Sequence, residues 1–458
     1  MSKDISTQLK DLCLPLSTKK KISALLNSLS DEIKINDQGI KVRGTRTRFI
    51  RLLDPLLEIG NPNSVSLWVR YFWDNEIQKA LHNKFYYPST IELDLTTYCN
   101  NSCFFCKEGL RKNRCEYPFK KLQKDLKEFS KIPQIKSIIY SGGGDPTCYS
   151  RIIDALSLTY NYGFSIYLST NGGLIGQPQL PLQLFVDNIS ILKFSIDAPT
   201  HETYNRIHHS TESVEKGAPE SVDYVFDQVK ALVQLRDNQN RVIRFKNQVR
   251  KLPLIVIGMV VNSINQKETL LMAQRAVKVG ADMLWFRPPI TVNKTIVNIK
   301  DGVKQMEDAK RLFGDKILIK TFNHRLDFNT LQEDYFARCI CHPVINPDGA
   351  EYGKGSLTPC LFRRGNRPDN YWLAIGSPCV ESIIDLIKSK EYSNKIKEQN
   401  ENLHSISARR CPRCRKTLNN IFFDILSHSS LKEQETMKEI ILSIFPATIE
   451  GEIIKYLY

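Results

Sequence analysis

Short apolar runs recur along the middle of the chain, and stretches of helical periodicity lie between them. The apolar runs have strand character and cover residues 91–95, 135–140, 164–168, 189–196, 254–261 and 282–286. The helical stretches cover residues 119–129, 149–160, 221–235 and 266–279. Strands that alternate with helices form βαβ units with a parallel sheet. The pattern therefore predicts an α/β fold, and its six strands fit a partial (β/α)6 barrel.

Polar residues and glycines gather where these predicted strands end. Residues 141–147 read Ser-Gly-Gly-Gly-Asp-Pro-Thr, residues 169–173 read Ser-Thr-Asn-Gly-Gly, and Ser195 and Asp197 end a further run. Barrels of this kind place their chemistry at the carboxyl ends of the strands, so we expect a ligand site there. Ser, Asn and Asp also favour turns for local reasons, and turn formation is the alternative explanation.

Three cysteines follow the first predicted strand within one short loop. Cys99, Cys103 and Cys106 have the spacing Cys-x3-Cys-x2-Cys. A closed zinc or iron–sulfur site takes four protein ligands, whereas three thiolates on a four-iron cluster leave one iron open to a small molecule. A zinc knuckle completed by a distant residue is one alternative, and a group of unrelated core thiols is another.

This triplet, placed directly after a first strand, resembles that of the radical S-adenosylmethionine (radical SAM) superfamily. The loop after the second strand extends the resemblance, because Gly143, Gly144 and Asp145 are similar to the family motif Gly-Gly-Glu-Pro, with Asp in place of Glu. The resemblance implies a [4Fe–4S] cluster on the three cysteines, whose open iron binds the methionine moiety of SAM. Reductive cleavage of SAM would then give a 5′-deoxyadenosyl radical.

The same resemblance suggests which residues contact SAM. The glycines would let main-chain groups approach the ligand, and the acid, here Asp145, would hold the SAM amino group. Phe105 stands where the family often has an aromatic residue against the adenine, and a core position is the alternative for it. Four residues at later strand ends are expected at the ribose and the carboxylate: Ser169, Asn171, Ser195 and Asp197.

A second group of cysteines lies after the predicted barrel. Cys341 and Cys360 flank the turn-forming residues 346–349, Asn-Pro-Asp-Gly, which predict a hairpin between them. This arrangement resembles the opening of the SPASM and twitch auxiliary-cluster domains. By that resemblance Cys411 and Cys414 would complete four thiolates for one auxiliary [4Fe–4S] cluster. No cysteine follows Cys414, so the domain is closer to twitch than to SPASM.

Two alternatives remain for this second group. Cys339 lies two positions before Cys341 and can replace it as a ligand. Zinc accepts four cysteines as readily as a cluster does, so a zinc ribbon with the same thiolates is the other possibility. The remaining cysteines, which have no evident partner in the sequence, are expected to be ordinary thiols: Cys13, Cys115, Cys148 and Cys379.

The chain is predicted to contain three domains. Residues 1–88 form a small N-terminal α+β domain with a helix at 18–29, a hairpin across 32–43, and helices at 49–59 and 65–81. It faintly resembles the leader-binding domain of peptide-modifying radical SAM enzymes, and a cap without such a role is the alternative. Residues 89–325 form the barrel. Residues 326–458 form the auxiliary-cluster domain, with a helical tail from residue 418 that is expected to pack on the barrel.

Composition narrows the possible surroundings and partners. The net charge of +15 admits a nucleic acid, an acidic peptide or a phosphorylated substrate, but no basic and aromatic stripe supports nucleic acid beyond the charge itself. No run of 18 apolar residues occurs, and the N-terminus lacks the apolar core of a signal peptide. Twelve cysteines in 458 residues favour metal ligands in a reducing compartment. We therefore expect a cytoplasmic protein without a membrane span.

The sequence predicts a radical SAM enzyme, an oxidoreductase or a maturase, that takes its electron from a flavodoxin- or ferredoxin-type donor. The first candidate substrate is a ribosomally made peptide, which the extra N-terminal domain and the auxiliary cluster favour. The second is a small molecule such as an aminoglycoside or a nucleotide sugar, which the single auxiliary cluster favours. A non-catalytic zinc-binding adaptor is the alternative of another class. No catalytic acid or base can be identified from the sequence.

Overall fold

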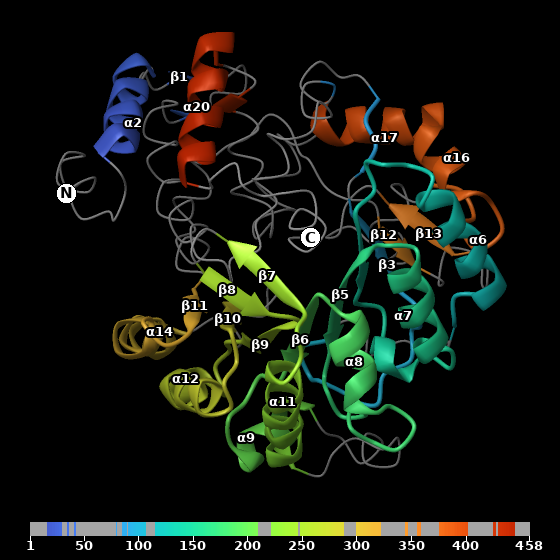
Figure 1. Ribbon diagram of the computed structural model, residues 1–458, viewed down its shortest axis with the longest axis vertical. Helices are drawn as coiled ribbons and strands as arrows, with labels where there is room; N and C mark the ends of the chain where they lie inside the picture. Colours follow the sequence, from blue (N-terminus) through green and yellow to red (C-terminus); the bar gives the residue numbers. More distant parts are fainter. Residues whose placement is uncertain are drawn as a thin grey trace.

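The computed structural model describes fifteen stretches of the chain, in which a curved sheet carries helices on its outer side (Figure 1). The described residues are 16–29, 34–35, 41–42, 79, 85–88, 90–106, 115–208, 221–245, 248–287, 299–321, 344–346, 355–358, 375–401, 425–426 and 429–444.

Seven parallel strands of the described residues follow one another across the sheet in chain order. They are β3 (Thr90–Leu93), β4 (Ser137–Tyr140), β5 (Ser165–Thr170), β6 (Ile191–Ser195), β9 (Leu254–Val260), β10 (Met283–Arg287) and β11 (Leu318–Lys320). Each pairs in parallel with the next. The α/β class and the six predicted strands are confirmed. β11 was not predicted, because three residues are too short to give a recognisable pattern.

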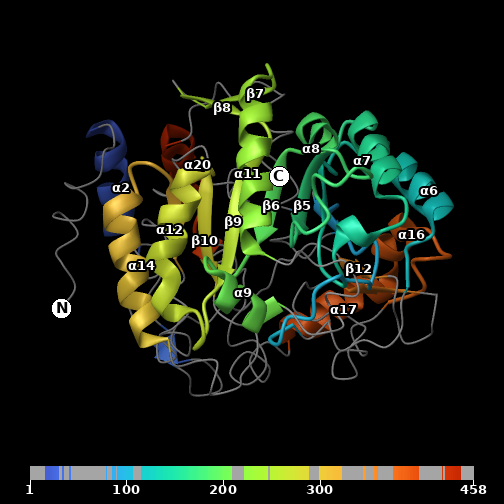
Figure 2. The ribbon, with the colours of Figure 1, turned by 90° about the horizontal axis from the view of Figure 1, so that it is seen from below.

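Helices connect these strands and cover the outer face of the sheet (Figure 2). They are α6 (Phe119–Phe129), α7 (Ile152–Asn161), α8 (Leu182–Asn188), α9 (His201–His208), α11 (Val222–Asp237), α12 (Thr269–Lys278) and α14 (Lys300–Phe313). The four predicted helical stretches are confirmed as α6, α7, α11 and α12. In α6, Leu122, Leu126 and Phe129 recur at helical spacing and are all buried, so this face of the helix packs on the sheet.

The two faces of the strands differ in character. In β6, Leu192 and Phe194 belong to the apolar core shared with the helices, whereas Lys193 and Ser195 alternate with them along the strand. Successive side chains of a strand point to opposite faces, so Lys193 and Ser195 lie on the inner face. The inner face of the sheet therefore carries polar groups close to the carboxyl end of β6.

A hairpin extends the sheet beyond β3. β12 (Val344–Asn346) pairs in parallel with β3 and in antiparallel fashion with β13 (Ser356–Thr358). This confirms the hairpin predicted between Cys341 and Cys360. Both cysteines lie outside the described residues, as do Cys13, Cys339, Cys411 and Cys414, so the auxiliary-cluster site stays a prediction.

The segment after this hairpin is attached to α6 and to the residues just before it by polar contacts. It contains α16 (Ile383–Lys388) and α17 (Lys390–Glu401). Tyr117 Oη donates to Asp125 Oδ2 at 2.7 Å, and Pro378 O lies 3.0 Å from the same hydroxyl. Ser382 Oγ donates to Glu128 Oε2 at 3.0 Å. Residues 375–401 are therefore packed against the first helix of the barrel.

A second, short hairpin is inserted between α11 and β9. β7 (Val242–Phe245) and β8 (Gln248–Lys251) pair in antiparallel fashion with each other and do not join the main sheet. The segment was not predicted as strand, because Arg and Lys interrupt its apolar residues.

Segments from both ends of the chain pack together. α2 (Leu16–Ser28) lies beside α20 (Leu431–Ile444), with Lys21 Nζ 2.6 Å from Glu439 Oε2 (Figure 1). β1 (Lys34–Ile35) and β2 (Lys41–Val42) form the predicted hairpin. We expected the tail against the barrel, whereas α20 contacts α2. The apolar stripe of a helix predicts that the helix is packed, but it does not name the partner. The helices expected at 49–59 and 65–81 lie outside the described residues, apart from residue 79.

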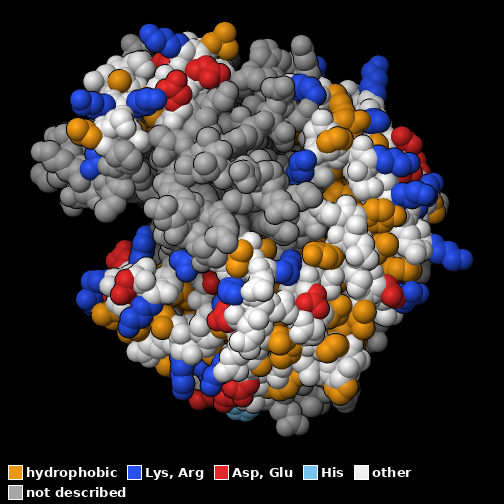
Figure 3. All heavy atoms as spheres, in the orientation of Figure 1, with side chains coloured by type: hydrophobic (Ala, Val, Ile, Leu, Met, Phe, Trp, Pro, Cys, Tyr) orange, Lys and Arg blue, Asp and Glu red, His pale blue; other side chains and the backbone are white. Residues whose placement is uncertain are grey.

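One face of the described surface mixes both signs of charge. On the face drawn in Figure 3, Lys and Arg side chains are interspersed with Asp and Glu rather than gathered in one patch. None of the helices in the described ranges is long and apolar enough to cross a lipid bilayer.

Candidate active site

The three cysteines lie in the loop that leaves β3, and the end of α9 holds this loop in place. Ser102 N donates to His208 O at 3.0 Å, and Phe104 N donates to Ile207 O at 3.1 Å. The last helical carbonyls are groups that a helix leaves without internal partners, and here the cysteine loop supplies their donors. The loop is therefore built against a helix that the sequence did not predict.

The glycine-rich loop after β4 packs directly on the cysteine loop. Gly144 N donates to Thr96 O and Asp145 N donates to Tyr98 O, both at 2.8 Å. A Cβ on Gly144 would lie 1.9 Å from Tyr98 O, and one on Gly143, whose φ is +76°, would lie 2.9 Å from Thr96 O. Both positions thus need glycine to let two backbones approach. This requirement exists without any bound ligand.

Both oxygens of the Asp145 carboxylate accept hydrogen bonds from the protein. Oδ1 accepts from Thr147 N at 2.9 Å and Thr147 Oγ1 at 2.6 Å, and Oδ2 accepts from Asn171 N at 2.6 Å. Thr170 Oγ1 lies 2.9 Å and 3.0 Å from the two oxygens. Burial raises the pKa of Asp145, against the effect of these hydrogen bonds. The carboxylate fixes the turn after β4 to the end of β5, and its expected contact with the SAM amino group stays a prediction.

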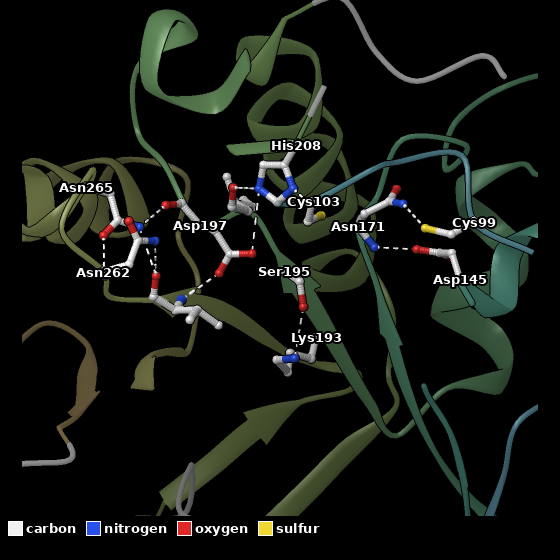
Figure 4. A network of polar contacts seen from close by, with 12 residues as sticks. Cys99, Cys103, Asp145, Asn171, Lys193, Ser195, Asp197, His208, Asn262 and Asn265 are labelled. Atoms are coloured by element: carbon white, nitrogen blue, oxygen red, sulfur yellow. Dashed lines mark hydrogen bonds and ion pairs between the residues drawn. The ribbon is translucent and has the colours of Figure 1, made fainter. Parts of the chain in front are cut away.

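Asn171 continues this network into the cysteine loop (Figure 4). Its Nδ2 lies 2.7 Å from Asn100 Oδ1 and 3.7 Å from Cys99 Sγ. Burial first, and then the charge of Asp145, raise the pKa of the Cys99 thiol to about 12, while the hydrogen bond from Asn101 N lowers it in part. Without a metal ion beside it, this thiol is therefore protonated at neutral pH.

His208, at the end of α9, connects Cys103 to the turn after β6 (Figure 4). Its Nδ1 lies 3.0 Å from Cys103 Sγ, and its Nε2 lies 2.6 Å from Ile196 O and 3.6 Å from Asp197 Oδ2. A carbonyl oxygen only accepts, so Nε2 carries a proton. Burial lowers the pKa of His208, which favours the neutral ring. In that form Nδ1 accepts a hydrogen bond from the Cys103 thiol.

The Asp197 carboxylate is also used by the protein. Asp197 has a φ of +59°, an uncommon backbone conformation for a residue other than glycine. Val260 N donates to its Oδ1 at 2.5 Å, and Asn265 Nδ2 donates to its main-chain oxygen at 2.6 Å. These contacts attach the turn after β6 to β9 and the loop that follows it. The expected contact of Asp197 with SAM stays a prediction.

Ser169 and Ser195 are brought together by Lys193. The Lys193 ammonium donates to both hydroxyl oxygens at 3.0 Å, and the lysine is 3% exposed. The two serines were expected at one ligand from their positions at strand ends, and the structure places them around a common cation. Their contact with SAM stays a prediction. The geometry does not distinguish a contact with the ribose from a contact with the carboxylate.

Phe105 is partly buried and packs on the apolar core. Its ring lies 5.4 Å from that of Phe104, with an angle of 76° between the planes, an edge-to-face arrangement that aromatic pairs favour. Phe105 therefore contacts the core, as the alternative interpretation of this residue expected. Its contact with adenine stays a prediction.

The donor set of the loop fits an iron–sulfur cluster. Burial and then the neighbouring thiols Cys106 and Cys99 raise the pKa of Cys103 above its usual range, so the three sulfurs lie within electrostatic reach of one another. In the described part of the chain no three His, Cys, Asp or Glu side chains converge on one metal ion. A four-iron cluster does not require convergence, because each thiolate binds a different iron. Asn100 Nδ2 is buried without a hydrogen-bond partner among the described residues, and cluster sulfurs accept hydrogen bonds.

Sequence reasoning missed three residues of this site or gave them no role. Lys193 was available as a signal, because it is the one charged residue in the apolar run 189–196. His208 and Asn100 gave no such signal, since their partners lie far away in the chain or depend on the conformation of the loop. Cys148 was expected to be an ordinary thiol, and its Sγ lies 3.7 Å from Asn100 Oδ1, beside the cysteine loop.

Comparison with known proteins identifies the segment that carries this site. Residues 93–232 match the family model of the radical SAM superfamily. This segment is similar to radical SAM domains. The cysteine triplet, the glycine-rich loop and Lys193 all lie within it. The prediction of an enzyme built around SAM is confirmed at this level.

A curated relative is similar to a longer part of this chain. The chain is 25% identical over 316 residues to the tungsten-containing aldehyde ferredoxin oxidoreductase cofactor-modifying protein of Pyrococcus furiosus. The match covers 66% of this chain and 81% of that protein, so it extends beyond the radical SAM domain.

Solved structures share the fold. SuiB of Streptococcus suis bound to S-adenosylmethionine has a TM-score of 0.50 at 13% identity, over 75% of this chain and 74% of that one. SuiB bound to its precursor peptide SuiA has a TM-score of 0.50 at 14% identity, over 69% and 68%. At such identities the likeness concerns the fold alone.

Proposed function

We propose that this chain binds a [4Fe–4S] cluster at Cys99, Cys103 and Cys106 and abstracts hydrogen from a carbon of a ribosomally made peptide. The cluster and SAM, when bound, would supply the electron and the 5′-deoxyadenosyl radical. The observation that carries the proposal is the packing of the three-cysteine loop on Gly143 and Gly144 inside a radical SAM domain.

The residues of this chain have separable tasks in that reaction. The cysteines would bind the cluster, and Asn171 Nδ2, which faces Cys99 Sγ, would orient that sulfur. His208 holds the end of α9 against the turn after β6 through its Nε2 contact with Ile196 O. Precise positioning is the main contribution of a protein whose cofactor performs the difficult step. The helix end beneath the loop and the carboxylates behind it supply this positioning.

A peptide substrate is supported by the structural neighbours and by the chain's own architecture. SuiB shares this fold and has been observed with a precursor peptide. Beyond the radical SAM domain, the chain has an N-terminal segment with a helix and a hairpin. By the resemblance noted for residues 1–88, this segment would bind the leader of the peptide.

One observation favours a second candidate. The relative from Pyrococcus furiosus, similar over 316 residues, is named for modification of an enzyme cofactor. A non-peptide cofactor or its precursor is therefore the competing substrate class.

We also infer an auxiliary [4Fe–4S] cluster on Cys341, Cys360, Cys411 and Cys414. The pairing of β12 with β13 supports this, because the hairpin lies between the first two of these cysteines, as in the twitch-like arrangement. Such a cluster would carry electrons between the substrate and a flavodoxin- or ferredoxin-type partner. Iron content tests the inference, with about eight irons per chain expected for two four-iron clusters.

The activity is tested with anaerobically purified protein, reconstituted with iron and sulfide and incubated with SAM and dithionite. We expect 5′-deoxyadenosine from the wild type, little from Cys106→Ala, and an unchanged yield from Cys115→Ala. Cys115 is a buried cysteine outside the triplet, so it controls for the loss of a thiol. Equal yields from the wild type and Cys106→Ala would refute the assignment of the cluster.

The substrate class is tested with extracts of the host cell, separated by size and added to the same assay. A peptide substrate is expected to increase 5′-deoxyadenosine formation and to lose this effect after treatment with protease. Stimulation that survives protease would favour the cofactor candidate instead.

A further inference from the structure

Arg287, the last residue of β10, has a buried hydrogen-bond donor without a partner. Its side chain is partly exposed, but Nε is buried and donates to no acceptor among the described residues. Buried polar groups are normally paired, because a donor that is not loses its hydration without compensation. The unpaired guanidinium donor at the end of a barrel strand therefore needs an explanation.

The alternation of side chains along β10 places Arg287 on the inner face of the sheet. Leu284 and Phe286 belong to the apolar core shared with the helices. Successive side chains of a strand point to opposite faces, so Trp285 and Arg287 lie on the face away from the helices. Both are partly exposed, which leaves them accessible to a ligand.

Trp285 continues a row of inner-face positions from β6. Ser195 pairs with Gly258 across β6 and β9, and Gly258 pairs with Trp285 across β9 and β10. A Cβ on Gly258 would lie 2.7 Å from Lys193 Cε, so the lysine stem occupies the place of the missing side chain. Trp285 therefore comes next to this stem in the row, and Arg287 stands one row nearer the carboxyl edge.

Arg287 shares that edge with the candidate cluster site. The carboxyl ends of parallel strands meet at one edge of a sheet, and the cysteine loop and the glycine-rich loop follow β3 and β4 there. Three strands separate β4 from β10 in the sheet, and the sheet is curved (Figure 1). Arg287 therefore lies on the opposite half of the same inner face, where the part of a substrate that is not attacked by the radical would extend.

The ring of Trp285 orients the guanidinium. Arg287 Cζ lies 5.6 Å from the centroid of this ring, a distance at which a cation is attracted to an aromatic face. Stacking of this kind holds the planar group without using its N–H donors. A guanidinium only donates, and its fork matches the two oxygens of a carboxylate or a phosphate. The pair therefore favours an anionic ligand.

We propose that Arg287 and Trp285 form a substrate-recognition site, in which Arg287 binds an oxyanion of the substrate and Trp285 is a positioning residue. The inference rests on the proposed function and narrows its substrate class. In a peptide, the oxyanion is the carboxylate of an Asp or Glu side chain, and a phosphate of a cofactor precursor is the other source of the same chemistry. The net charge of +15 suits an anionic partner.

The test uses two tripeptides that differ in one charge, acetyl-Gly-Glu-Gly-amide and acetyl-Gly-Gln-Gly-amide. Their dissociation constants are measured by equilibrium dialysis on the cluster-loaded full chain with SAM and without reductant. We expect the wild type to prefer the Glu peptide about tenfold, and Arg287→Gln to lose this preference by weakening the Glu peptide alone. Arg311→Gln removes an exposed charge from α14 and should change neither constant. Equal binding of the two peptides by the wild type would overturn the proposal.

Two further variants separate the roles of the two residues. Arg287→Lys keeps the charge and lacks the planar fork, so we expect about a threefold loss of affinity for the Glu peptide. Trp285→Leu keeps Arg287 and removes the ring that orients it, and should lower the preference for the Glu peptide about threefold. A merely structural role of Trp285 would weaken both peptides equally. These variants decide the matter if Arg287→Gln does not fold.

The source of the oxyanion is decided by methyl phosphate, which competes with the Glu peptide in the same dialysis. If methyl phosphate binds more tightly than the Glu peptide and loses this affinity in Arg287→Gln, the peptide assignment is wrong and the cofactor candidate is favoured. Protein that prefers the Glu peptide but forms no 5′-deoxyadenosine from SAM and dithionite would refute the proposed function and leave the oxyanion site. Protein that forms 5′-deoxyadenosine without this preference would refute the site alone.

Discussion

The two acids and the two serines expected at SAM occupy similar positions but have different surroundings. Asp145 and Asp197 follow β4 and β6, and their oxygens accept hydrogen bonds from buried groups of other segments. Ser169 and Ser195 end β5 and β6 and accept from Lys193, which leaves their own protons to donate. The comparison indicates that the acids mainly hold the loops, and it favours the serines over the acids as residues that would contact SAM.

The largest expected effect is on stability, from Asp145→Ala. This change removes the acceptor of Thr147 N, Asn171 N and the Thr170 hydroxyl. Buried donors without partners cost about 1–3 kcal/mol each, so we expect a loss of about 4 kcal/mol of unfolding free energy, measured by denaturant titration of metal-free protein. Asp154→Ala, which breaks an exposed ion pair with Arg151, is expected to cost less than about 1 kcal/mol. Equal losses in the two variants would remove the structural role assigned to Asp145.

A smaller effect on stability is expected for Gly144→Ala. Its new methyl group would meet the backbone of Tyr98, which cannot rotate away, and we expect a loss of about 3 kcal/mol together with reduced iron loading. Gly163 is a loop glycine with a φ of +81° and open space around it. Gly163→Ala should therefore cost only the backbone strain of about 1 kcal/mol and load iron normally. If Gly144→Ala loads iron normally, the contact between the glycine-rich loop and the cysteine loop is not needed to form the cluster site.

The smallest effect on stability is expected for Ser195→Ala, and its effect appears in binding. Loss of one neutral acceptor costs about 1 kcal/mol, whereas the affinity for SAM is expected to fall about tenfold. Dialysis of cluster-loaded protein measures this affinity. The comparison between acids and serines fails if Ser195→Ala binds SAM normally while a folded Asp145→Asn variant does not.

Much of the fold was predictable because the strands of a buried parallel sheet consist of nearly continuous runs of apolar residues. β4, β6, β9 and β10 coincide with such runs, and α6 begins and ends at the predicted residues. β11 was missed because it is short, and the β7–β8 hairpin because basic residues interrupt it.

Many residues of the site were predictable from the sequence, whereas the contacts between them were less so. The triplet and the glycine-rich loop follow from local spacing. The role of Asp145 depends on Thr170 and Asn171, about 25 residues away, and no local pattern encodes that contact. Lys193 interrupts an apolar run, so its charge was visible in the sequence, but its partners on β5 and β6 became evident only with the sheet register.

The most direct test of the central claim is electron paramagnetic resonance of the reduced, reconstituted protein with and without SAM. The account predicts a [4Fe–4S] signal whose shape changes when SAM is added, because one iron is open to it. In a triple variant with Cys99, Cys103 and Cys106 all replaced by Ala, the part of the signal that responds to SAM should be absent. A signal that ignores SAM, or a protein that binds zinc in place of iron, would contradict the account.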